Sequence, residues 1–406
     1  MPKKLKIIDL FSGAGGLSLG FELTKKFEIV AAIDNWKPSI ETFSFNHPNL
    51  SDEQIIHDDI TNIFPTNSKK IISNKWLKEI DLDVLVGGPP CQGMSLAGKR
   101  LNDDPRNDLF KSFISAIQLL QPKYFLMENV PGLLSMQNGQ IHNAIVNSIK
   151  GINYNLPITS QVTILKAECY GVPQIRRRVF YLGARKDIKN PFNFWPPVPS
   201  HQEFSRNKYK KGKADKQMQM DFGSSNDYLL NPISVKEAIS DLPKLKSGEG
   251  SDEMSYGRKR KLTEYQISMR NWDECPRKNE KPILFNHEPP NHTKDMIKKI
   301  KKTKQGESVD PNYSDSRKWH PEYPGYTVKA LGAGGGSTNR RAFHFDEDQP
   351  RASTVRENAR IQSFPDWYKF IGSKTDQMSL VGNSVPPILA KEIAKFLHER
   401  IKSNKH

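Results

Sequence analysis

Short apolar runs alternate with longer amphipathic stretches through about the first 185 residues. The apolar runs are KIIDL, EIVAAID, DVLVGG, YFLMEN and VFYLGA, and each has the length of a buried strand. Strands that alternate with helix-length stretches are typical of an α/β protein with a doubly wound, mostly parallel sheet. One such stretch, Asn107 to Gln121, places apolar residues at steps of three and four before Pro122, which predicts a helix that packs on the sheet.

The pattern changes near Phe192, where periodicity weakens and basic stretches such as HQEFSRNKYKKGKADKQMQ and MIKKIKKTK follow. This region is either a loop-rich domain that contacts a charged partner or a partly disordered linker, and its scattered aromatic residues favour the domain. Ordered signals return after Phe345, with helices predicted over Arg356 to Phe364 and Pro387 to Ile401. We therefore expect a first domain over 1–190, a smaller domain over 191–340, and a segment over 341–406 that returns to the first domain.

The charge balance of the 406-residue chain points to a polyanionic partner. Sixty-one Lys and Arg residues stand against 45 Asp and Glu residues, which gives a net charge of +16. Each phosphate that a basic side chain neutralises releases counterions, so nucleic acid is the leading partner. A solvated basic surface with no polyanionic partner is the alternative.

The cysteines and the chain start favour an intracellular protein. Only Cys91, Cys169 and Cys275 occur, too far apart for a paired metal motif, so neither a disulfide framework nor a zinc site is indicated. The start MPKKLKIIDLF lacks the apolar stretch of a signal peptide, and no segment approaches the ~20 apolar residues of a membrane span. We expect a cytoplasmic protein with no membrane partner and no metal.

A glycine-rich turn after the first strand predicts a nucleotide-like ligand. Residues Asp9 to Gly16 read DLFSGAGG, and their glycines permit a tight turn and close approach of a ligand to the backbone. Gly13 and Gly15 fit the dinucleotide fingerprint, but Ser18 stands where it requires a third glycine, which disfavours NAD.

Carboxylates follow the next two strands. Asp34 ends the second strand, where it can accept hydrogen bonds from ribose hydroxyls, and Trp36 could stack on an adenine or a sulfonium or else fill the core. Asp58 and Asp59 precede Ile60 at the end of the third strand, where a carboxylate can meet an adenine amino group or simply form an acidic turn. Carboxylates without arginines suit a ligand that lacks phosphates, which favours S-adenosylmethionine over a dinucleotide.

The loop after the strand DVLV carries a candidate nucleophile. Cys91 lies in GGPPCQGMS, just beyond a strand end, where active sites of this architecture gather, and two prolines stiffen its approach. A thiol with an ordinary pKa is only a few per cent ionised at neutral pH, so a nucleophile here needs a cationic neighbourhood. A merely buried cysteine is the alternative.

Two further strand ends add a carboxylate and arginines. Glu128 follows the strand KYFLM, and a hydrogen-bonding Glu can bind the N3 edge of cytosine and make C6 open to attack. Alternation along QIRRRV puts Arg176 and Arg178 on one face and Arg177 on the other. The two could hold a base carbonyl, a phosphate or Glu128, and a plain basic strand edge is the alternative.

Together these residues resemble the cytosine carbon-5 DNA methyltransferase family over Ile7 to Arg185 and from Tyr326 to the end. The motifs that carry the resemblance stand in the family's order: DLFSGAGG, IDNW, DDI, GGPPCQG, RNDLF, MENV, QIRRR, ARIQSFP and VGNSVPP. The resemblance implies a class I, Rossmann-like methyltransferase in which Cys91 attacks C6 of a flipped cytosine, Glu128 engages the ring and C5 receives the methyl group of S-adenosylmethionine.

The resemblance also implies roles for other residues. Arg178 would hold the cytosine carbonyl, and Gln92 to Arg106 would form a mobile loop that closes over DNA. The target-recognition domain would end at Tyr326-Thr327-Val328 with Gly334 to Gly336. Val328 stands there in place of the usual leucine. The residues implied to line the cofactor pocket are Phe11, Gly13, Gly16, Asp34, Trp36, Asp59, Ile60, Pro90, Leu109, Asn383 and Val385.

Other readings of the chain are weaker. A non-catalytic DNA-binding regulator would be expected to lack Cys91 or Glu128. The tRNA-modifying branch of the family carries a Cys-Phe-Thr signature after the proline-cysteine motif, and Gln92-Gly93-Met94-Ser95 departs from it here. Amino-group methyltransferases need an Asp- or Ser-Pro-Pro-aromatic motif, where this chain has Pro-Pro-Cys. We expect a monomer that binds double-stranded DNA through residues of roughly 190–330. A restriction endonuclease that acts on the same site is consistent with this reading, without a stable complex.

Overall fold

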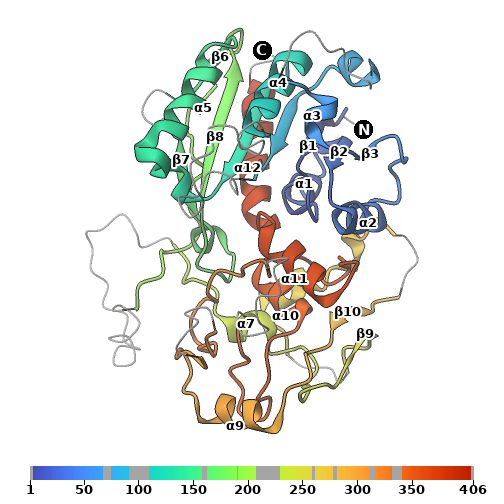
Figure 1. Cartoon of the computed structure of the whole chain (residues 1–406), viewed down its shortest axis with the longest axis vertical. Helices are drawn as coiled ribbons and strands as arrows, with labels where there is room; N and C mark the ends of the chain where they lie inside the picture. Colours follow the sequence, from blue (N-terminus) through green and yellow to red (C-terminus); the bar gives the residue numbers. More distant parts are fainter. Residues whose placement is uncertain are drawn as a thin grey trace.

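The computed structural model describes residues 3–66, 75–90, 109–157, 162–189, 191–206, 229–257, 261–277, 281–310, 316–331 and 341–403. An upper part built on a large sheet and a lower part of short helices and loops lie one above the other in Figure 1. The long C-terminal helix α12 (Pro387–Ser403) extends from the lower part along the sheet.

One eight-stranded sheet dominates the upper part, in the order β3-β2-β1-β4-β5-β8-β6, with β7 also paired to β8. Strands β1 to β5 are mutually parallel, and β8 runs antiparallel to β5, β6 and β7. This confirms the predicted α/β class with a mostly parallel sheet, and all five predicted runs are strands. The strands are β1 (Leu5–Leu10), β2 (Phe27–Asp34), β3 (Ile55–His57), β4 (Val84–Gly87), β5 (Tyr124–Asn129), β6 (Tyr154–Asn155), β7 (Thr163–Lys166) and β8 (Arg177–Arg185).

Helices cover both faces of the sheet because side chains alternate along each strand. In β1, Ile8 and Leu10 join the core under α3, α4 and α5, whereas Leu5 and Ile7 join the core under α1 and α12. The predicted helix before Pro122 is α4, and its described part buries Phe113 and Ile117 completely. The helices of this part are α1 (Gly16–Glu22), α2 (Lys37–Asn46), α3 (Ile60–Ile63), α4 (Leu109–Leu120) and α5 (Gln140–Lys150), with short 3-10 helices at Lys75–Glu79, Pro131–Leu134, Met136–Gly139 and Ala167–Tyr170.

Helices α1 and α12 pack at backbone contact. A methyl group added at Gly20 would lie 2.3 Å from Cβ of Ala390 and 2.6 Å from the carbonyl oxygen of Pro387. One added at Gly16 would lie 2.3 Å from the carbonyl oxygen of Val385. Glycine at both positions therefore lets the end of the chain lie directly against the first helix.

The lower part is built on a second core, to which residues from both 191–340 and 341–406 contribute and which Ala14 and Leu19 of the upper part join. Val235 and Tyr265 pack there with Ala359 and Phe364. The expected boundaries at 190 and 340 stay a prediction. The elements are α7 (Val235–Ile239), β9 (Ser251–Met254), α8 (Glu264–Met269), a 3-10 helix at Trp272–Glu274, β10 (Leu284–His287), α9 (Lys294–Lys302), α10 (Val355–Ile361) and α11 (Lys374–Asn383).

Buried ion pairs reinforce this lower core. Arg351 contacts Glu357 at 2.7 Å, and Arg360 contacts Asp366 at 2.6 Å and Asp241 at 2.9 Å. Each guanidinium thus has a carboxylate partner, which offsets the cost of removing it from water.

Two predicted helices have slightly different ends. The helix predicted over Arg356 to Phe364 is α10, which ends at Ile361 because Ser363 adopts a left-handed backbone (φ 68°) two residues before Pro365. The C-terminal helix extends two residues beyond the predicted Ile401. Among the described residues, no helix combines the length and the apolar character needed to cross a membrane.

Candidate active site and cofactor cavity

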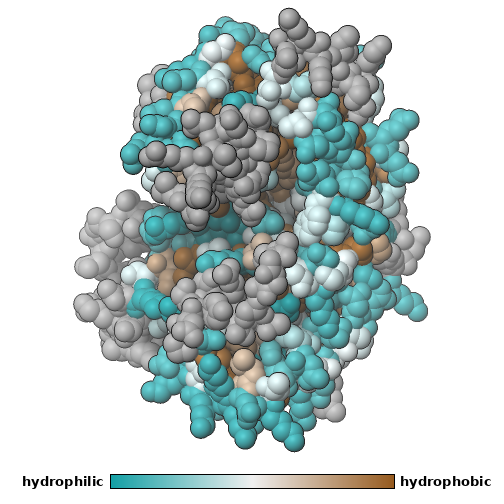
Figure 2. All heavy atoms as spheres, in the orientation of Figure 1, coloured by the Kyte–Doolittle hydropathy of each residue, from teal (hydrophilic) through white to brown (hydrophobic). Residues whose placement is uncertain are grey.

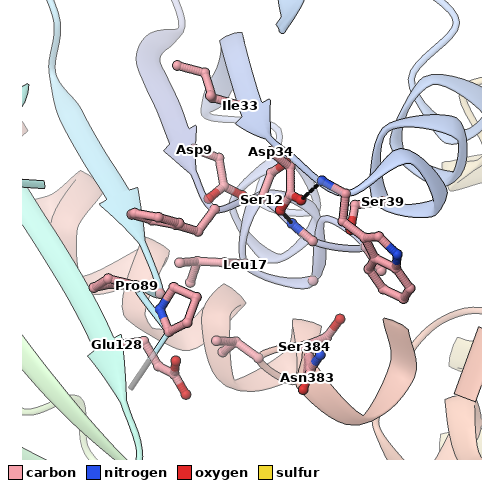
Figure 3. A pocket seen from close by; sticks show the side chains of 18 of the residues that line it. Asp9, Ser12, Leu17, Ile33, Asp34, Ser39, Pro89, Glu128, Asn383 and Ser384 are labelled. Carbon is pink, nitrogen blue, oxygen red and sulfur yellow. Dashed lines mark hydrogen bonds between the residues drawn. The ribbon is translucent and has the colours of Figure 1, made fainter. Parts of the chain in front are cut away.

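A cavity of about 410 Å³ opens at the carboxyl ends of β1, β2, β4 and β5. The turn between α11 and α12 closes it from the opposite side, as Figure 3 shows with Asn383 and Ser384 facing the strand ends. In a doubly wound sheet this edge is where ligands bind. Its lining includes Phe11, Gly13, Gly16, Asp34, Trp36, Ile60, Pro90, Leu109, Glu128, Arg178, Asn383 and Val385, together with Asp9, Ser12, Asp58, Asn129 and Ser384.

The turn after β1 is built on left-handed backbone angles. Phe11, Gly13 and Gly15 have φ of 57°, 54° and 73°. At Gly15 a side chain is also excluded by space, because an added Cβ would lie 2.7 Å from the hydroxyl of Tyr368. The predicted tight turn is therefore present, and it brings backbone N–H groups to the cavity wall.

Asp34 fixes this turn from the end of β2. Its two carboxylate oxygens accept hydrogen bonds from the backbone N–H groups of Gly13 at 2.9 Å and Trp36 at 2.8 Å, drawn as dashed lines in Figure 3. Burial raises the pKa of Asp34. A carboxylate held by two N–H groups and by the Ser39 side chain keeps one orientation, with its remaining acceptor capacity toward the cavity.

Asp9 adds a second carboxyl group beside Asp34. It is 1% exposed and accepts a hydrogen bond from the Ser18 hydroxyl. Burial raises the pKa of Asp9 to about 7, and the nearby charge of Asp34 adds to this rise. Ser18, at the position where a dinucleotide site would have glycine, therefore binds the Asp9 carboxyl group.

At the end of β3 the structure separates two adjacent aspartates. Asp58 lines the cavity, whereas Asp59 does not. The Asp59 carboxylate caps α3 by accepting from the N–H of Thr61 at 2.9 Å and from its hydroxyl at 2.7 Å. A contact of Asp59 with the cofactor stays a prediction, and Asp58 is the better placed carboxylate.

Glu128 and Arg178 form a buried ion pair at the other end of the cavity. Arg178 Nε lies 2.7 Å from Glu128 Oε1, and both side chains are little exposed. Burial raises the pKa of Glu128, while the charges of Arg178 and Arg176 oppose that rise. Gly88 leaves room for this carboxyl group, since an added Cβ would lie 3.0 Å from Oε2. Such a carboxyl group can accept or donate a hydrogen bond to a base.

Arg176 and Arg177 have other partners. As alternation predicts, Arg177 lies on the opposite side, 3.3 Å from Glu203. Arg176 is 1% exposed and donates to the carbonyl oxygens of Val328 at 3.0 Å, Gly382 at 2.8 Å and Ser384 at 3.1 Å. It does not line the cavity, so the structure gives it a positioning role in the wall. A direct catalytic role for Arg176 stays a prediction.

The loop that is predicted to carry the nucleophile follows Pro89 and Pro90 at the cavity wall. Pro89 is anchored through its carbonyl oxygen, which accepts from Nδ2 of Asn129 at 2.9 Å, and Pro90 lines the cavity. Cys91 lies outside the described residues, as do the loop Gln92 to Arg106 and the glycines Gly334 to Gly336.

Several lining residues were missed in the sequence. Asn129 follows Glu128 in the motif MENV, and Ser384 lies between Asn383 and Val385 in the motif VGNSVPP. These two motifs were therefore the signal that could have identified them. Asp9 reads as a buried strand residue, and only the packing reveals that it lines the cavity. No cluster of three or more metal-binding side chains occurs in the described part of the chain.

The chain matches one family model over nearly its whole length. Residues 5–399 match the C-5 cytosine-specific DNA methylase family. Among similar proteins, the Type II methyltransferase M1.HphI of Haemophilus parahaemolyticus is 32% identical over 96% of this chain and 86% of its own length. The Type II methyltransferase M.FnuDI of Fusobacterium nucleatum is 32% identical over 98% of this chain and 95% of its own.

Solved structures agree in fold. A prophage-encoded E. coli protein assigned as a DNA modification methyltransferase has a TM-score of 0.73 and 28% identity, over 98% of this chain and all of its own. Spodoptera frugiperda DNMT2 shares the fold alone, with a TM-score of 0.53 and 20% identity over 97% of this chain and 99% of its own. The chain therefore belongs to the C-5 cytosine-specific DNA methylase family and is a DNA cytosine-5-methyltransferase.

Proposed function

We propose that the protein methylates C5 of a flipped cytosine in duplex DNA, with S-adenosylmethionine as donor and Cys91 as nucleophile. The observation that carries the proposal is that one cavity joins the Asp34 turn to the Glu128–Arg178 pair. A donor site and a base site are thus continuous, which a direct methyl transfer requires.

The cavity suits S-adenosylmethionine better than a nucleotide with phosphates. Its end near β1 and β2 is lined by Asp9, Asp34 and Asp58, and the one arginine in the described lining, Arg178, is already paired with Glu128. Carboxylates attract a sulfonium and can accept from ribose hydroxyls, but they repel phosphate. The volume of about 410 Å³ is in the range of sites for ligands of this size. When bound, S-adenosylmethionine supplies a methyl group on a positively charged sulfur.

Glu128 and Arg178 are the groups that we assign to the target base. Glu128 would bind the N3 edge of cytosine, and its buried setting favours the protonated form that donates to N3. Arg178 would hold Glu128 in place and reach the carbonyl of the base. Both contacts draw electron density from the ring, so that the Cys91 thiolate can add to C6 and C5 can take up the methyl group. Loss of the C5 proton then lets the C6–S bond break and restores the aromatic ring.

The buried site requires the base to leave the helix. Glu128 is 8% exposed in the described part of the chain, and a stacked cytosine cannot offer both faces of its ring to a thiolate and a methyl donor. The cost of extrusion, a few kcal/mol, would be met by contacts in the cavity. We assign recognition of the surrounding sequence to the region 191–340.

The biological setting is inferred from the relatives, which are Type II methyltransferases. We infer that the protein acts as a monomer in the cytoplasm and protects DNA within a restriction-modification system. A restriction endonuclease would act on the same site without forming a stable complex.

The test is methyl transfer from labelled S-adenosylmethionine to duplex DNA that carries diverse short sites, with fluorocytosine-substituted DNA as a covalent trap. We expect label at C5 and a trapped adduct that Cys91→Ser abolishes. Cys169→Ser is the matched control, because burial raises the pKa of that thiol to about 11 and keeps it unreactive. Transfer to tRNA alone, or an adduct that survives in Cys91→Ser, would refute the proposal.

A further inference from the structure

A second cavity of about 360 Å³ lies behind the wall of the first and is lined by cations. Arg206, Arg317, Lys329 and Arg341 line it, with Trp319, Tyr326 and Thr327 among the remaining residues. The described lining contains no carboxylate. Positive side chains gathered around one hollow attract an anion.

Arg341 is the residue that most needs an anion. It is 6% exposed, burial lowers its pKa, and none of its guanidinium nitrogens has a hydrogen-bond or ion-pair partner among the described residues. Its Nε is fully buried without an acceptor. A buried guanidinium with no partner is costly for a folded protein.

The terminal guanidinium nitrogens of the other buried arginines in the described chain have acceptors, although Nε of Arg176, like that of Arg341, is buried without one. Arg351 and Arg360 contact carboxylates at 2.7 Å and 2.6 Å, and Arg176 and Arg356 donate to backbone carbonyl oxygens. The protein therefore satisfies its buried arginines with internal acceptors, and Arg341 is the exception that points to an acceptor from outside.

The basic cavity is built around an aromatic ring. The guanidinium of Arg206 lies 5.7 Å from the centre of the Tyr326 ring and donates to its hydroxyl at 2.6 Å, and the Arg317 guanidinium lies 5.4 Å from the same ring. Cation–π contacts of this kind hold the two guanidiniums against the ring. A planar, forked guanidinium is the side chain best suited to bind phosphate oxygens.

The two cavities share structural elements. Ile175, just before β8, and Met378 in α11 line the basic cavity. Arg178 in β8 and Leu380 in α11 line the first one. The Arg176 guanidinium joins them, since it binds the carbonyl oxygen of Val328 on one side and that of Ser384 on the other.

We propose that this basic cavity, named here for Arg206, Arg317, Lys329 and Arg341, binds a backbone phosphate of the DNA strand that carries the target cytosine. The inference rests on the proposed function and adds a phosphate site to it. Binding there would hold the strand while its base enters the first cavity, and it would supply the acceptor that Arg341 lacks.

The test compares Arg341→Met with Lys150→Met, which removes one exposed charge at the end of α5 on the sheet. DNA affinity is measured between about 50 and 200 mM salt, because affinity that depends on phosphate contacts falls steeply over this range. Tm and the affinity for S-adenosylmethionine are measured for the same variants. We expect Arg341→Met to bind DNA about 10- to 100-fold more weakly, as for loss of a charged hydrogen bond. The slope of log affinity against log salt should fall by about one.

Stability separates this role from a structural one. Because Arg341 has no internal partner, Arg341→Met should keep or raise Tm and leave S-adenosylmethionine affinity unchanged, and Arg341→Lys should recover the salt slope. Lys150→Met should match the wild type in every measurement. A lower Tm with wild-type DNA binding and salt slope would overturn the phosphate site.

The outcomes also separate this inference from the proposed function. Methyl transfer by the wild type with an unchanged salt slope in Arg341→Met overturns the phosphate site alone. A reduced slope in Arg341→Met without methyl transfer by the wild type overturns the proposed reaction and leaves the phosphate site standing. Wild-type protein that does not bind DNA overturns both.

Discussion

Replacing Gly20 by alanine should loosen the contact between α1 and α12. The added methyl group would lie 2.3 Å from Cβ of Ala390 and 2.6 and 2.7 Å from backbone atoms of Pro387 and Lys391, so relief requires α12 itself to move. Overpacking of this kind costs about 3 kcal/mol. Alanine in a helix gains about 1 kcal/mol over glycine. We therefore expect a net loss of about 2 kcal/mol in the free energy of unfolding.

The same shift should reach the cofactor cavity. Val385 and Asn383 line that cavity, and they stand just before the first turn of α12. Urea denaturation gives the stability change, and titration with S-adenosylmethionine should show an affinity lower by about tenfold, equivalent to about 1.4 kcal/mol.

Gly132→Ala is the matched control, because no atom lies within 4 Å of the position that its Cβ would take. It should match the wild type in both measurements. Wild-type stability in Gly20→Ala would show that the two helices can separate at little cost and would refute the reasoning.

Three further changes test other parts of the molecule. Glu128→Gln should lower the rate of methyl transfer about 100-fold or more, because the group that exchanges a proton with the base is lost. Equilibrium titration should show an unchanged affinity for S-adenosylmethionine. A rate within a few-fold of the wild-type rate would contradict this role. Asp9 has a pKa raised to about 7 in the folded protein, so the fold binds this proton more tightly than the unfolded chain and loses stability as pH rises from about 4 to 7. Asp9→Asn should flatten that loss in urea denaturation at a series of pH values, and an unchanged profile would argue against the buried acid. Glu357→Gln should lower the free energy of unfolding by about 3–5 kcal/mol, because it leaves Arg351 with a buried, unpaired charge. The same change at the exposed residue Glu399 is the control and should leave the free energy of unfolding unchanged.

The sheet could be predicted because its strands are buried on both faces and read as continuous apolar runs. The ends of elements were harder to predict. The helix α10 ends at Ile361 because of the left-handed backbone at Ser363, and nothing in the residue type of Ser363 predicts that angle. The strands β6 and β7, of two and four residues, pair only with β8 and have no pattern of their own.

The site was predictable where a motif ends a strand. Asp34 and Glu128 line the cavity because they stand near the carboxyl ends of β2 and β5. Arg178 stands near the start of β8, which reaches the same edge because it runs antiparallel to β5. Side-chain partners were not predictable. Asp58 rather than Asp59 lines the cavity because the helix cap at Thr61 engages Asp59. Likewise, the difference between Arg341 without a partner and Arg351 paired with Glu357 depends on distant contacts that no local pattern records.

The return of the chain end to its beginning has a consequence for synthesis. Tyr368 donates a hydrogen bond to the carbonyl oxygen of Ala14, 354 positions earlier, and the turn at Asn383 to Val385 closes the cavity that the first strands open. A chain still on the ribosome has its glycine turn and its carboxylates but lacks the opposite wall. Contacts between such distant positions also form late in folding. The methyl donor should therefore be held only after residues 383–385 have left the ribosome and folded back, so a shorter nascent chain should not methylate DNA.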